Sequence, residues 1–299
     1  MASTSVTVPE QRSRFRRIVA VLAISLLAFY LGWCTLFYFV QGEITFPAPA
    51  HYPKATPSDA GMPFEDLHIP VNASEQIHAW WIPSSSSSNK VLLVFHGNGY
   101  VIEQGFGGEL RPLGEFIPLH HVGANLLLVD YRGFGSSSPG AASEKSVYED
   151  ARAAFNYLTV QRAMSSRDII LVGRSIGTGV ATEMAKEHPD AGGLILISPL
   201  TSVSDVAKRI WYLRPIPLSI LLRDRLENLS KIGSVHMPVF LTVGGEDDLT
   251  PPVMAQTLFE SANQPKQLYL VPGANHNDIM AIGGQMLEDR TRAFVQTIP

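Results

Sequence analysis

Short runs of aliphatic residues alternate with longer helix-like stretches through the C-terminal two thirds of the chain. Six such runs occupy residues 91–95, 125–130, 168–173, 193–198, 238–243 and 267–271. Runs that are apolar at nearly every position are typical of strands buried on both faces, as in a parallel sheet. The pattern therefore predicts an α/β fold, doubly wound, with one mostly parallel sheet, helices on both of its faces and one main domain over residues 64–299.

Two further elements are predicted beside these runs. Residues 75–83, EQIHAWWIP, alternate enough between polar and apolar positions to form an early antiparallel strand. A polar connection, SSSSSN, follows this strand. An alanine-rich helix is predicted to begin at Ser146, because Ser146 and Glu149 have the spacing of a capping box.

The N-terminal part of the chain has a different pattern. Residues 18–40 carry no charge, and this length is enough for a helix to cross a hydrocarbon core of about 30 Å. Four arginines precede the apolar run and no comparable basic cluster follows it, so the positive-inside rule predicts that residues 1–17 are cytoplasmic. We expect the proline-rich residues 41–63 to be a linker and the domain that follows to be extracytoplasmic.

A cleaved signal peptide is the alternative interpretation of this segment. Such a peptide usually has an apolar region of about 7 to 15 residues with a small-x-small cleavage site close behind it. Ala48-Pro49-Ala50 has that form, but it lies well beyond the apolar run and contains a proline. An uncleaved membrane anchor is the favoured interpretation.

Composition and charge narrow the class of protein. With 45% hydrophobic and 17% charged residues the chain can bury a sizeable core, which excludes disorder for most of it. Beyond the first forty residues there are 19 basic and 26 acidic residues, a net charge of −7, which argues against nucleic acid as a partner. Cys34 is the only cysteine, so an intramolecular disulfide is excluded.

One interval between predicted strands is unusually long. Residues 198–238 separate two strands by about forty residues, and within this interval residues 201–236 are predicted to form a lid over the site. The insertion holds many apolar side chains, among them Trp211, Leu213 and Leu222. These side chains could line an acyl pocket or dock on a bilayer, but for most of them packing of the insertion onto the sheet is the favoured interpretation.

The stretch GRSIGTG, residues 173–179, has two incompatible interpretations. As a glycine-rich dinucleotide loop it should follow the first strand of the sheet, but it follows at least the third parallel-type strand. A short-chain dehydrogenase also needs Tyr-x-x-x-Lys, and none of the nine tyrosines has a lysine four places on. As Gly173-x-Ser175-x-Gly177 it is the sharp turn that exposes a nucleophilic serine between a strand and a helix. Gly179 is then a small residue that lets this helix pack closely on the sheet.

The downstream sequence supplies the partners that such a serine needs. A serine hydroxyl becomes an effective nucleophile when a histidine accepts its proton, and a carboxylate orients that histidine. GGEDDLTP, residues 244–251, and GANHND, residues 273–278, each follow a predicted strand in the order acid, then histidine. His276 is the predicted base. The acid could be any of three adjacent residues, Glu246, Asp247 and Asp248.

Five motifs in this order resemble those of the α/β-hydrolase superfamily of serine hydrolases. They are VFHGNG, VDYRGFGSS, GRSIGTG, GGEDDLTP and GANHND, and the resemblance covers roughly residues 64–298. Within that superfamily the chain resembles the branch of small membrane-associated hydrolases that includes depalmitoylating enzymes. The resemblance implies an α/β-hydrolase fold, no cofactor, and esters or thioesters with a lipophilic acyl group as substrates.

The resemblance also assigns roles to individual residues. It favours Asp247 as the acid, three residues after Gly244 and four before Pro251, with Asp248 as the second choice. Two backbone N–H groups are expected to form an oxyanion hole: that of Ile176, directly after the nucleophile, and, as the resemblance implies, that of Asn98, with Gly99 as the alternative. Asp130 and Arg132 are implied to brace a turn after their strand.

Some candidate features carry less weight. His120 and His121 are adjacent, but they lack an HExxH pattern or a nearby ligand cluster, so no metal site is predicted. Sequons at Asn72 and Asn228 matter only if the domain enters a eukaryotic secretory compartment.

Two alternative functions are considered for the chain: a peptidase, and a non-catalytic binding protein on a hydrolase scaffold. The sequence predicts no particular oligomeric state.

Overall fold

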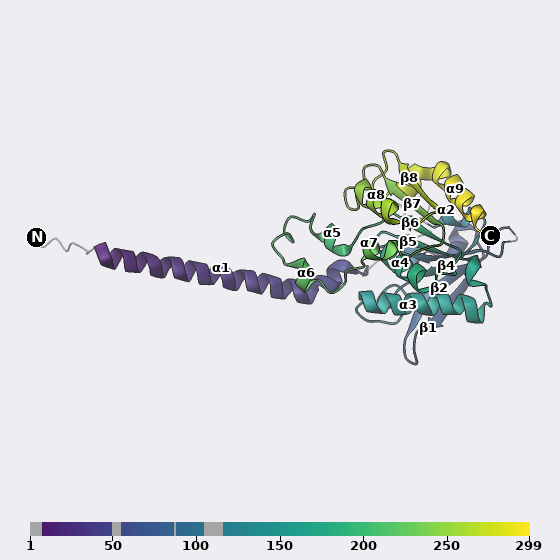
Figure 1. Cartoon of the computed structure of the whole chain (residues 1–299). Coiled ribbons are helices and arrows are strands. Elements are labelled where there is room, and N and C mark those ends of the chain that lie inside the picture. The colour runs from purple at the N-terminus through teal and green to yellow at the C-terminus, as the bar shows by residue number, and fades with distance from the viewer. Residues whose placement is uncertain (1–7, 50–54, 87, 105–115) are drawn as a thin grey trace, which may run out of the picture.

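An eight-stranded sheet forms the centre of the molecule in the computed structural model, which describes residues 8–49, 55–86, 88–104 and 116–299 (Figure 1). Its strand order is β1-β2-β4-β3-β5-β6-β7-β8. The strands are β1 Glu65–Pro70, β2 Gln76–Ile82, β3 Val91–Phe95, β4 Asn125–Val129, β5 Ile169–Arg174, β6 Gly193–Ile197, β7 Val239–Gly244 and β8 Lys266–Val271. β2 pairs antiparallel with β1 and β4, and all other neighbours are parallel, which confirms the predicted mostly parallel sheet.

Helices cover both faces of this sheet, as predicted. The helices are α1 Val8–Thr45, α2 Ile117–His120, α3 Glu144–Asn156, α4 Gly177–Glu187, α5 Val203–Ala207, α6 Leu218–Leu221, α7 Asn228–Ile232, α8 Pro252–Ser261 and α9 Ile279–Thr297. Single turns of 3₁₀ or π helix occupy Pro57–Ala60, Ile102–Gln104, Tyr157–Gln161 and Ser166–Asp168. α3, α4, α7 and α8 bury apolar side chains against one face, and α2 and α9 against the other.

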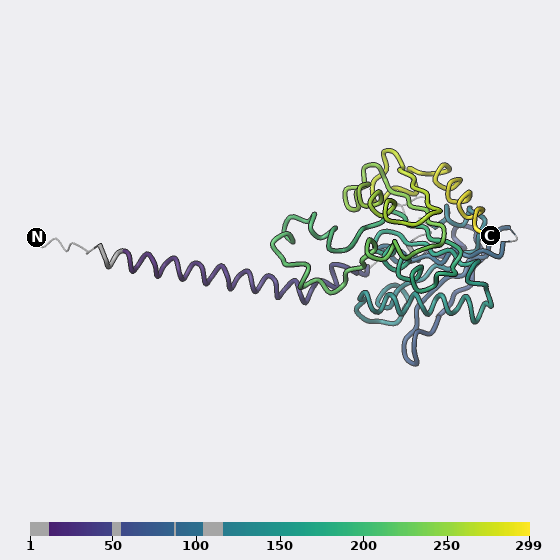
Figure 2. Tube along the Cα trace, viewed as in Figure 1, coloured from purple at the N-terminus to yellow at the C-terminus, as the bar shows by residue number. Residues whose placement is uncertain are grey.

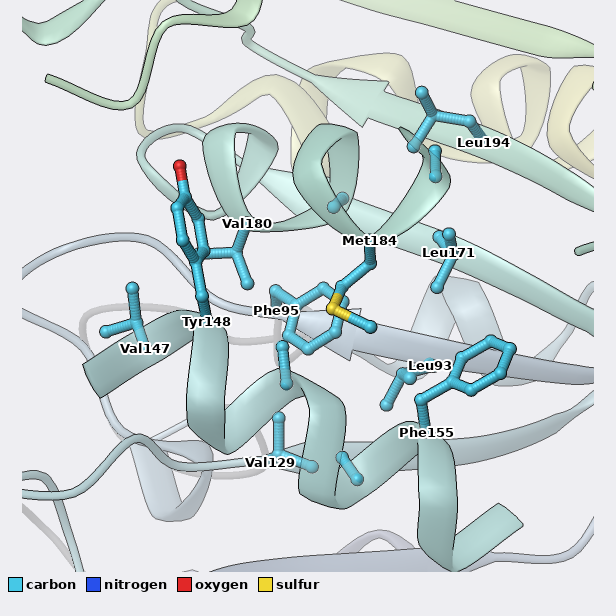
Figure 3. Close-up of a cluster of buried hydrophobic side chains, with 14 of the residues drawn as sticks. Leu93, Phe95, Val129, Val147, Tyr148, Phe155, Leu171, Val180, Met184 and Leu194 are labelled. Carbon is cyan, nitrogen blue, oxygen red and sulfur yellow. The ribbon is translucent and has the colours of Figure 1, made fainter. Parts of the chain in front are cut away.

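The alternation of side chains along β3 shows how the two layers arise. Leu93 and Phe95 join the core under α3 and α4, where Figure 3 places them near Met184 and Phe155. The intervening Leu92 and Val94 join the core under α2 and α9. A strand covered on both sides must be apolar at every position, and this explains why continuous aliphatic runs located the strands in the sequence.

α1 projects away from the domain, and its C-terminal part lies against the domain (Figures 1 and 2). Residues 12–45 form a helix long and apolar enough to cross a membrane, and its first two thirds are exposed. The helix continues five residues past the expected boundary at residue 40, into the segment predicted as a linker. The first seven residues of the predicted cytoplasmic segment and residues 50–54 of the linker lie outside the described residues.

The insertion packs differently from the expectation. It carries α5, α6 and α7, and many of its apolar side chains form a separate cluster with Phe37 of α1 rather than packing onto the sheet. Leu213, Ile216 and Leu222 belong to this cluster. The expectation was wrong because residues 37 and 213 are far apart in the sequence, so the pattern along the chain does not reveal that α1 supplies the partner surface.

Two local predictions were incomplete. β1, which extends the sheet beyond β2, was not predicted, because its polar sequence EDLHIP has only a weak alternating pattern. The helix predicted from Ser146 begins three residues earlier, with Ser143 as the N-cap. The Ser143 hydroxyl accepts from the backbone N–H of Ser146, and the Ser146 hydroxyl accepts from the backbone N–H of Ser143. Ser146 therefore takes part in the capping box as its third residue and not as its cap.

Candidate active site

Ser175 lies at the tight turn between β5 and α4. Its φ is +52°, a left-handed conformation that is uncommon for a residue with a side chain, and it is 5% exposed. The turn requires glycine on both sides. A Cβ on Gly173 would lie 2.4 Å from the carbonyl oxygen of Gly177, and a Cβ on Gly177 would lie 2.2 Å from the carbonyl oxygen of Phe95. The two flanking glycines therefore allow the turn to pass close to its own helix and to β3.

Gly179, the third glycine of this stretch, has a different neighbour from the one expected. A Cβ at this position would lie 2.6 Å from the Cβ of Leu226. Leu226 belongs to the insertion and is fully buried. Gly179 thus gives room to the insertion and not to the sheet. The expectation of close helix-sheet packing at this residue was wrong because the insertion returns to the domain over this face of α4.

The structure brings Ser175, His276 and Asp247 into one hydrogen-bonded chain. Nε2 of His276 lies 3.0 Å from Oγ of Ser175, and Nδ1 of His276 lies 2.8 Å from Oδ2 of Asp247. The three residues follow β5, β8 and β7, whose carboxyl ends meet at one edge of the parallel sheet. All three side chains are buried. In this arrangement an imidazole can accept a proton from the serine hydroxyl while a carboxylate orients the ring.

The carboxylate of Asp247 is held by a set of donors. Its Oδ1 accepts from the backbone N–H groups of Leu249 and Thr250 at 3.0 and 2.8 Å, and its Oδ2 accepts from the Thr250 hydroxyl at 3.0 Å. Burial alone would raise the pKa of Asp247, but the hydrogen bonds from His276 and Thr250 outweigh burial and lower it. The group is therefore ionised at neutral pH. Its neighbours Glu246 and Asp248 are exposed.

Two residues of this site were not found from the sequence. The Thr250 hydroxyl lies 3.1 Å from Nδ1 of His276 and 3.1 Å from the carbonyl oxygen of Ser198, so it links the acid loop to the end of β6. The guanidinium of Arg174 donates to the backbone carbonyl of His276 at 3.0 Å. The spacing Asp247-x-x-Thr250 is typical of local side-chain to backbone bonding and could have signalled the first of them. No local signal marks the second, because its partner is 102 residues away.

Asn98 and Ile176 lie beside Ser175 in the same cavity. The alternative residue, Gly99, has its backbone N–H engaged, since it donates to the carbonyl oxygen of Pro47 at 2.9 Å. Ile176 stands directly before the first residue of α4. The N-terminus of this helix points toward the site and favours negative charge there.

The other residues singled out from the sequence lie outside this site. Asp130 is fully buried and accepts from the backbone N–H of Ile102 at 2.9 Å. Arg132 forms ion pairs with Asp150, Glu149 and Glu75, at 2.6 to 2.7 Å. Arg132 thus braces the turn after β4, which is the role implied by the resemblance, whereas the Asp130 carboxylate holds the segment after β3.

The adjacent histidines have ordinary partners at the end of α2. His120 contacts the carbonyl oxygen of Pro83 at 2.9 Å, and His121 contacts the carboxylate of Glu288 at 3.2 Å. Within the described ranges, no group of three or more His, Cys, Asp or Glu side chains is arranged to hold a metal ion.

The cavity beside Ser175 has a volume of about 140 Å³ and a largely apolar lining. The insertion contributes Val203, Val206, Ala207 and Ile210 to it. A larger open depression of about 680 Å³ lies between β1 and α3, and it is lined by none of the residues of the Ser175 site. The hydrogen-bonded Ser175, His276 and Asp247 and this apolar cavity therefore lie together at the carboxyl edge of the sheet.

Comparisons with known proteins show the family and the fold to which this chain is similar. The family model for the alpha/beta hydrolase fold matches residues 90–216. A Mycobacterium tuberculosis protein named as uncharacterized is 32% identical over 285 residues, which cover 94% of this chain and 96% of that protein. Human alpha/beta hydrolase domain-containing protein 17B is 31% identical over 225 residues, which cover 75% of this chain and 73% of that protein. A solved structure of a Pyrococcus furiosus esterase has a TM-score of 0.69 at 21% identity, covers 84% of this chain and 97% of its own, and shows likeness of fold.

Proposed function

This chain belongs to the alpha/beta-hydrolase fold family, and from that premise we propose that it is a membrane-anchored serine hydrolase that cleaves carboxylic esters or thioesters. The observation that carries the proposal is the hydrogen-bonded chain from Ser175 through His276 to Asp247. Enzymes that act on many different substrates share this fold, so an ester substrate is proposed from the residues of the site and not from the family.

In the acylation step Ser175 attacks the carbonyl carbon of the substrate. Its proton passes to Nε2 of His276 as the Oγ–C bond forms, and Asp247 stabilises the resulting imidazolium. The carbonyl oxygen becomes an oxyanion, for which the backbone N–H groups of Asn98 and Ile176 are the proposed donors; loss of one such donor lowers the rate about 100- to 1000-fold. When the intermediate collapses, the alcohol or thiol leaves with the proton from His276.

Deacylation repeats the same proton transfers with water. His276 accepts a proton from a water molecule that attacks the acyl carbon, and the second intermediate expels Ser175 as its hydroxyl. The products are the carboxylic acid and the free serine. Both steps require His276 to be neutral at the start, and the ionised Asp247 keeps its Nδ1 as the protonated nitrogen.

The lining of the cavity favours an ester over a peptide. An aminopeptidase needs a carboxylate near the nucleophile to hold the substrate's charged amine, and none of the described residues that line the cavity is Asp or Glu. An apolar lining instead suits the acyl part of an ester or thioester. A non-catalytic scaffold is disfavoured because Ser175 and His276 are within hydrogen-bonding distance and both buried.

We expect the full-length chain in detergent to hydrolyse short-chain p-nitrophenyl esters and to form a covalent adduct with a fluorophosphonate probe at Ser175. The probe reacts only with a serine that a base has activated. The measurement is a panel of esters, thioesters and aminoacyl anilides, together with mass spectrometry of the labelled peptide. Activity on the anilides alone would favour the peptidase, and the absence of any serine adduct would favour the scaffold.

The membrane part of the proposal rests on α1. Its side chains from residue 12 to residue 33 are exposed, including Phe15, Leu22 and Phe29, which would be unfavourable in water and favourable in a hydrocarbon core. Beside it, the Tyr30 hydroxyl donates to the carbonyl oxygen of Pro215 at 3.0 Å, so the insertion lies alongside the apolar run. Four arginines at the N-terminal end support a cytoplasmic N-terminus.

Translation of the full-length chain with microsomes is expected to attach a glycan to Asn72. This asparagine is exposed in the turn between β1 and β2, so it reports whether the domain has crossed the membrane. The second sequon is a poor reporter because Asn228 is fully buried in the folded domain. The glycan should disappear in Asn72→Gln. A glycan found only on a sequon tag placed before Met1 would reverse the proposed orientation.

A further inference from the structure

Part of the wall of the cavity beside Ser175 comes from the N-terminal helix α1, far from Ser175 in the sequence. Four of its lining residues belong to the last turns of α1: Phe37, Gln41, Ile44 and Thr45. The remaining lining comes from the insertion and from the loops around Ser175. A segment that composition alone would assign to the bilayer or to a linker therefore faces the residues proposed for catalysis.

The burial pattern of α1 shows that this contact involves one defined face. Cys34, Phe37, Gln41 and Thr45 are all buried, with spacings of three, four and four residues, which place them on one side of a helix. Between them Phe39 is 73% exposed. The helix is thus divided into an exposed part and a short packing face that belongs to the hydrolase domain.

Gln41 holds this face in position. Its side chain is 1% exposed. Both the nitrogen and the oxygen of its side-chain amide form hydrogen bonds with the backbone of the insertion. Its Nε2 donates to the carbonyl oxygen of Leu221 at 3.0 Å, and its Oε1 accepts from the backbone N–H of Arg223 at 2.8 Å. A buried amide left without these partners would be strongly unfavourable, so the register between α1 and the insertion is well specified.

We infer that α1 and the insertion together form an acyl-binding site, in which Phe37 of α1 helps to set the chain length of the substrate. The ligand is the aliphatic acyl chain of a carboxylic ester or thioester, and in this respect the inference rests on the proposed function. An apolar cavity of about 150 Å³ holds one benzene molecule. The cavity here, about 140 Å³, accordingly accepts an acyl chain of about six carbons.

This site also explains why the anchor would be retained. Cleavage after Ala50 would remove Phe37, Gln41, Ile44 and Thr45 and open the cavity to solvent along one side. It would also remove Pro47, whose carbonyl oxygen binds the N–H of Gly99 in the loop proposed to form the oxyanion hole. The anchor helix is therefore a structural part of the site as well as a tether.

The first test measures acyl-chain preference in the full-length chain in detergent. With p-nitrophenyl esters of two to twelve carbons, Phe37→Ala should shift the optimum by two or more carbons toward longer chains, and Phe37→Trp should shift it toward shorter ones. kcat/KM for the hexanoate should fall about tenfold in Phe37→Ala, the effect of a mismatch of one methylene or more. Phe39→Ala is the matched control, because Phe39 lies on the exposed side of the same helix. An unchanged chain-length preference in both Phe37 variants would overturn the inference. General misfolding would instead lower kcat/KM for all esters by the same factor.

The second test does not depend on hydrolysis. The full-length Ser175→Ala chain is mixed with a hexanoate ester that carries a diazirine at the end of its acyl chain, irradiated, and digested for mass spectrometry. We expect label on residues 37–45 and on the insertion, and label that avoids residues 37–45 would overturn the inference. If the wild-type chain hydrolyses no ester while residues 37–45 are labelled, the proposed function fails and the acyl-binding site stands.

Discussion

Replacing Ser175 with alanine is expected to lower kcat for ester hydrolysis about 10⁶-fold, the loss that follows when a triad nucleophile is removed. The Oγ of Ser175, which lies 3.0 Å from Nε2 of His276, forms the bond to the acyl carbon, so its removal takes away the nucleophile itself. Alanine keeps the Cβ and the backbone conformation of the turn. The remaining rate should reflect the oxyanion hole and substrate binding alone.

Ser198→Ala is the matched control for this loss. Ser198 follows the neighbouring strand β6, is also fully buried and also has a positive φ, of +48°. Within the described part of the chain its hydroxyl has no hydrogen-bond partner, so its removal should leave kcat within threefold of the wild type. Both variants are measured in the full-length chain with the same ester, and circular dichroism verifies the fold. Full activity in Ser175→Ala would refute the mechanism.

Asp247→Asn is expected to lower kcat about 10⁴-fold. With its amide oxygen in the place of Oδ1, an asparagine directs its NH₂ group at Nδ1 of His276, so the ring loses the tautomer that can accept the serine proton. The loop itself should survive, because an amide oxygen can still accept from the backbone N–H groups of Leu249 and Thr250. The expected defect is therefore in catalysis and not in folding.

Asp248→Asn provides the comparison for this variant. Asp248 is adjacent in the sequence and has the same charge, but it is exposed, so its replacement should change kcat/KM by less than threefold. The two variants are compared by kcat/KM over pH 5 to 9 and by thermal unfolding. A large loss in Asp248→Asn together with normal activity in Asp247→Asn would move the acid to the second residue.

Much of this architecture could be predicted because its signals are local or periodic. Strands buried on both faces must be apolar throughout, so the runs that became β3 to β8 were found from the pattern. The order of Ser175, Asp247 and His276 along the chain was informative for a related reason. In a parallel sheet the carboxyl ends of strands meet at one edge, so three loops that follow three strands converge without any need to know their distances.

The parts that could not be predicted depend on partners distant in the sequence. β1 is a strand because it pairs with β2 and not because of its own composition. Ser143 rather than Ser146 caps α3, a shift of less than one turn that propensity does not resolve. The close neighbour of Gly179 is Leu226, 47 positions further along the chain.

The amino-acid sequence was sufficient for the α/β class, the apolar N-terminal helix and the candidate serine and histidine, because each is encoded by neighbouring residues. Tertiary structure alone decided three further points: the burial of Asp247 against His276 while Asp248 is exposed, the engagement of Gly99 by Pro47, and the closure of the cavity by α1. Gln41 and Leu221 illustrate the reason, since they bond across 180 residues. Such contacts are formed by the packing of the whole chain, and no window of sequence contains both partners.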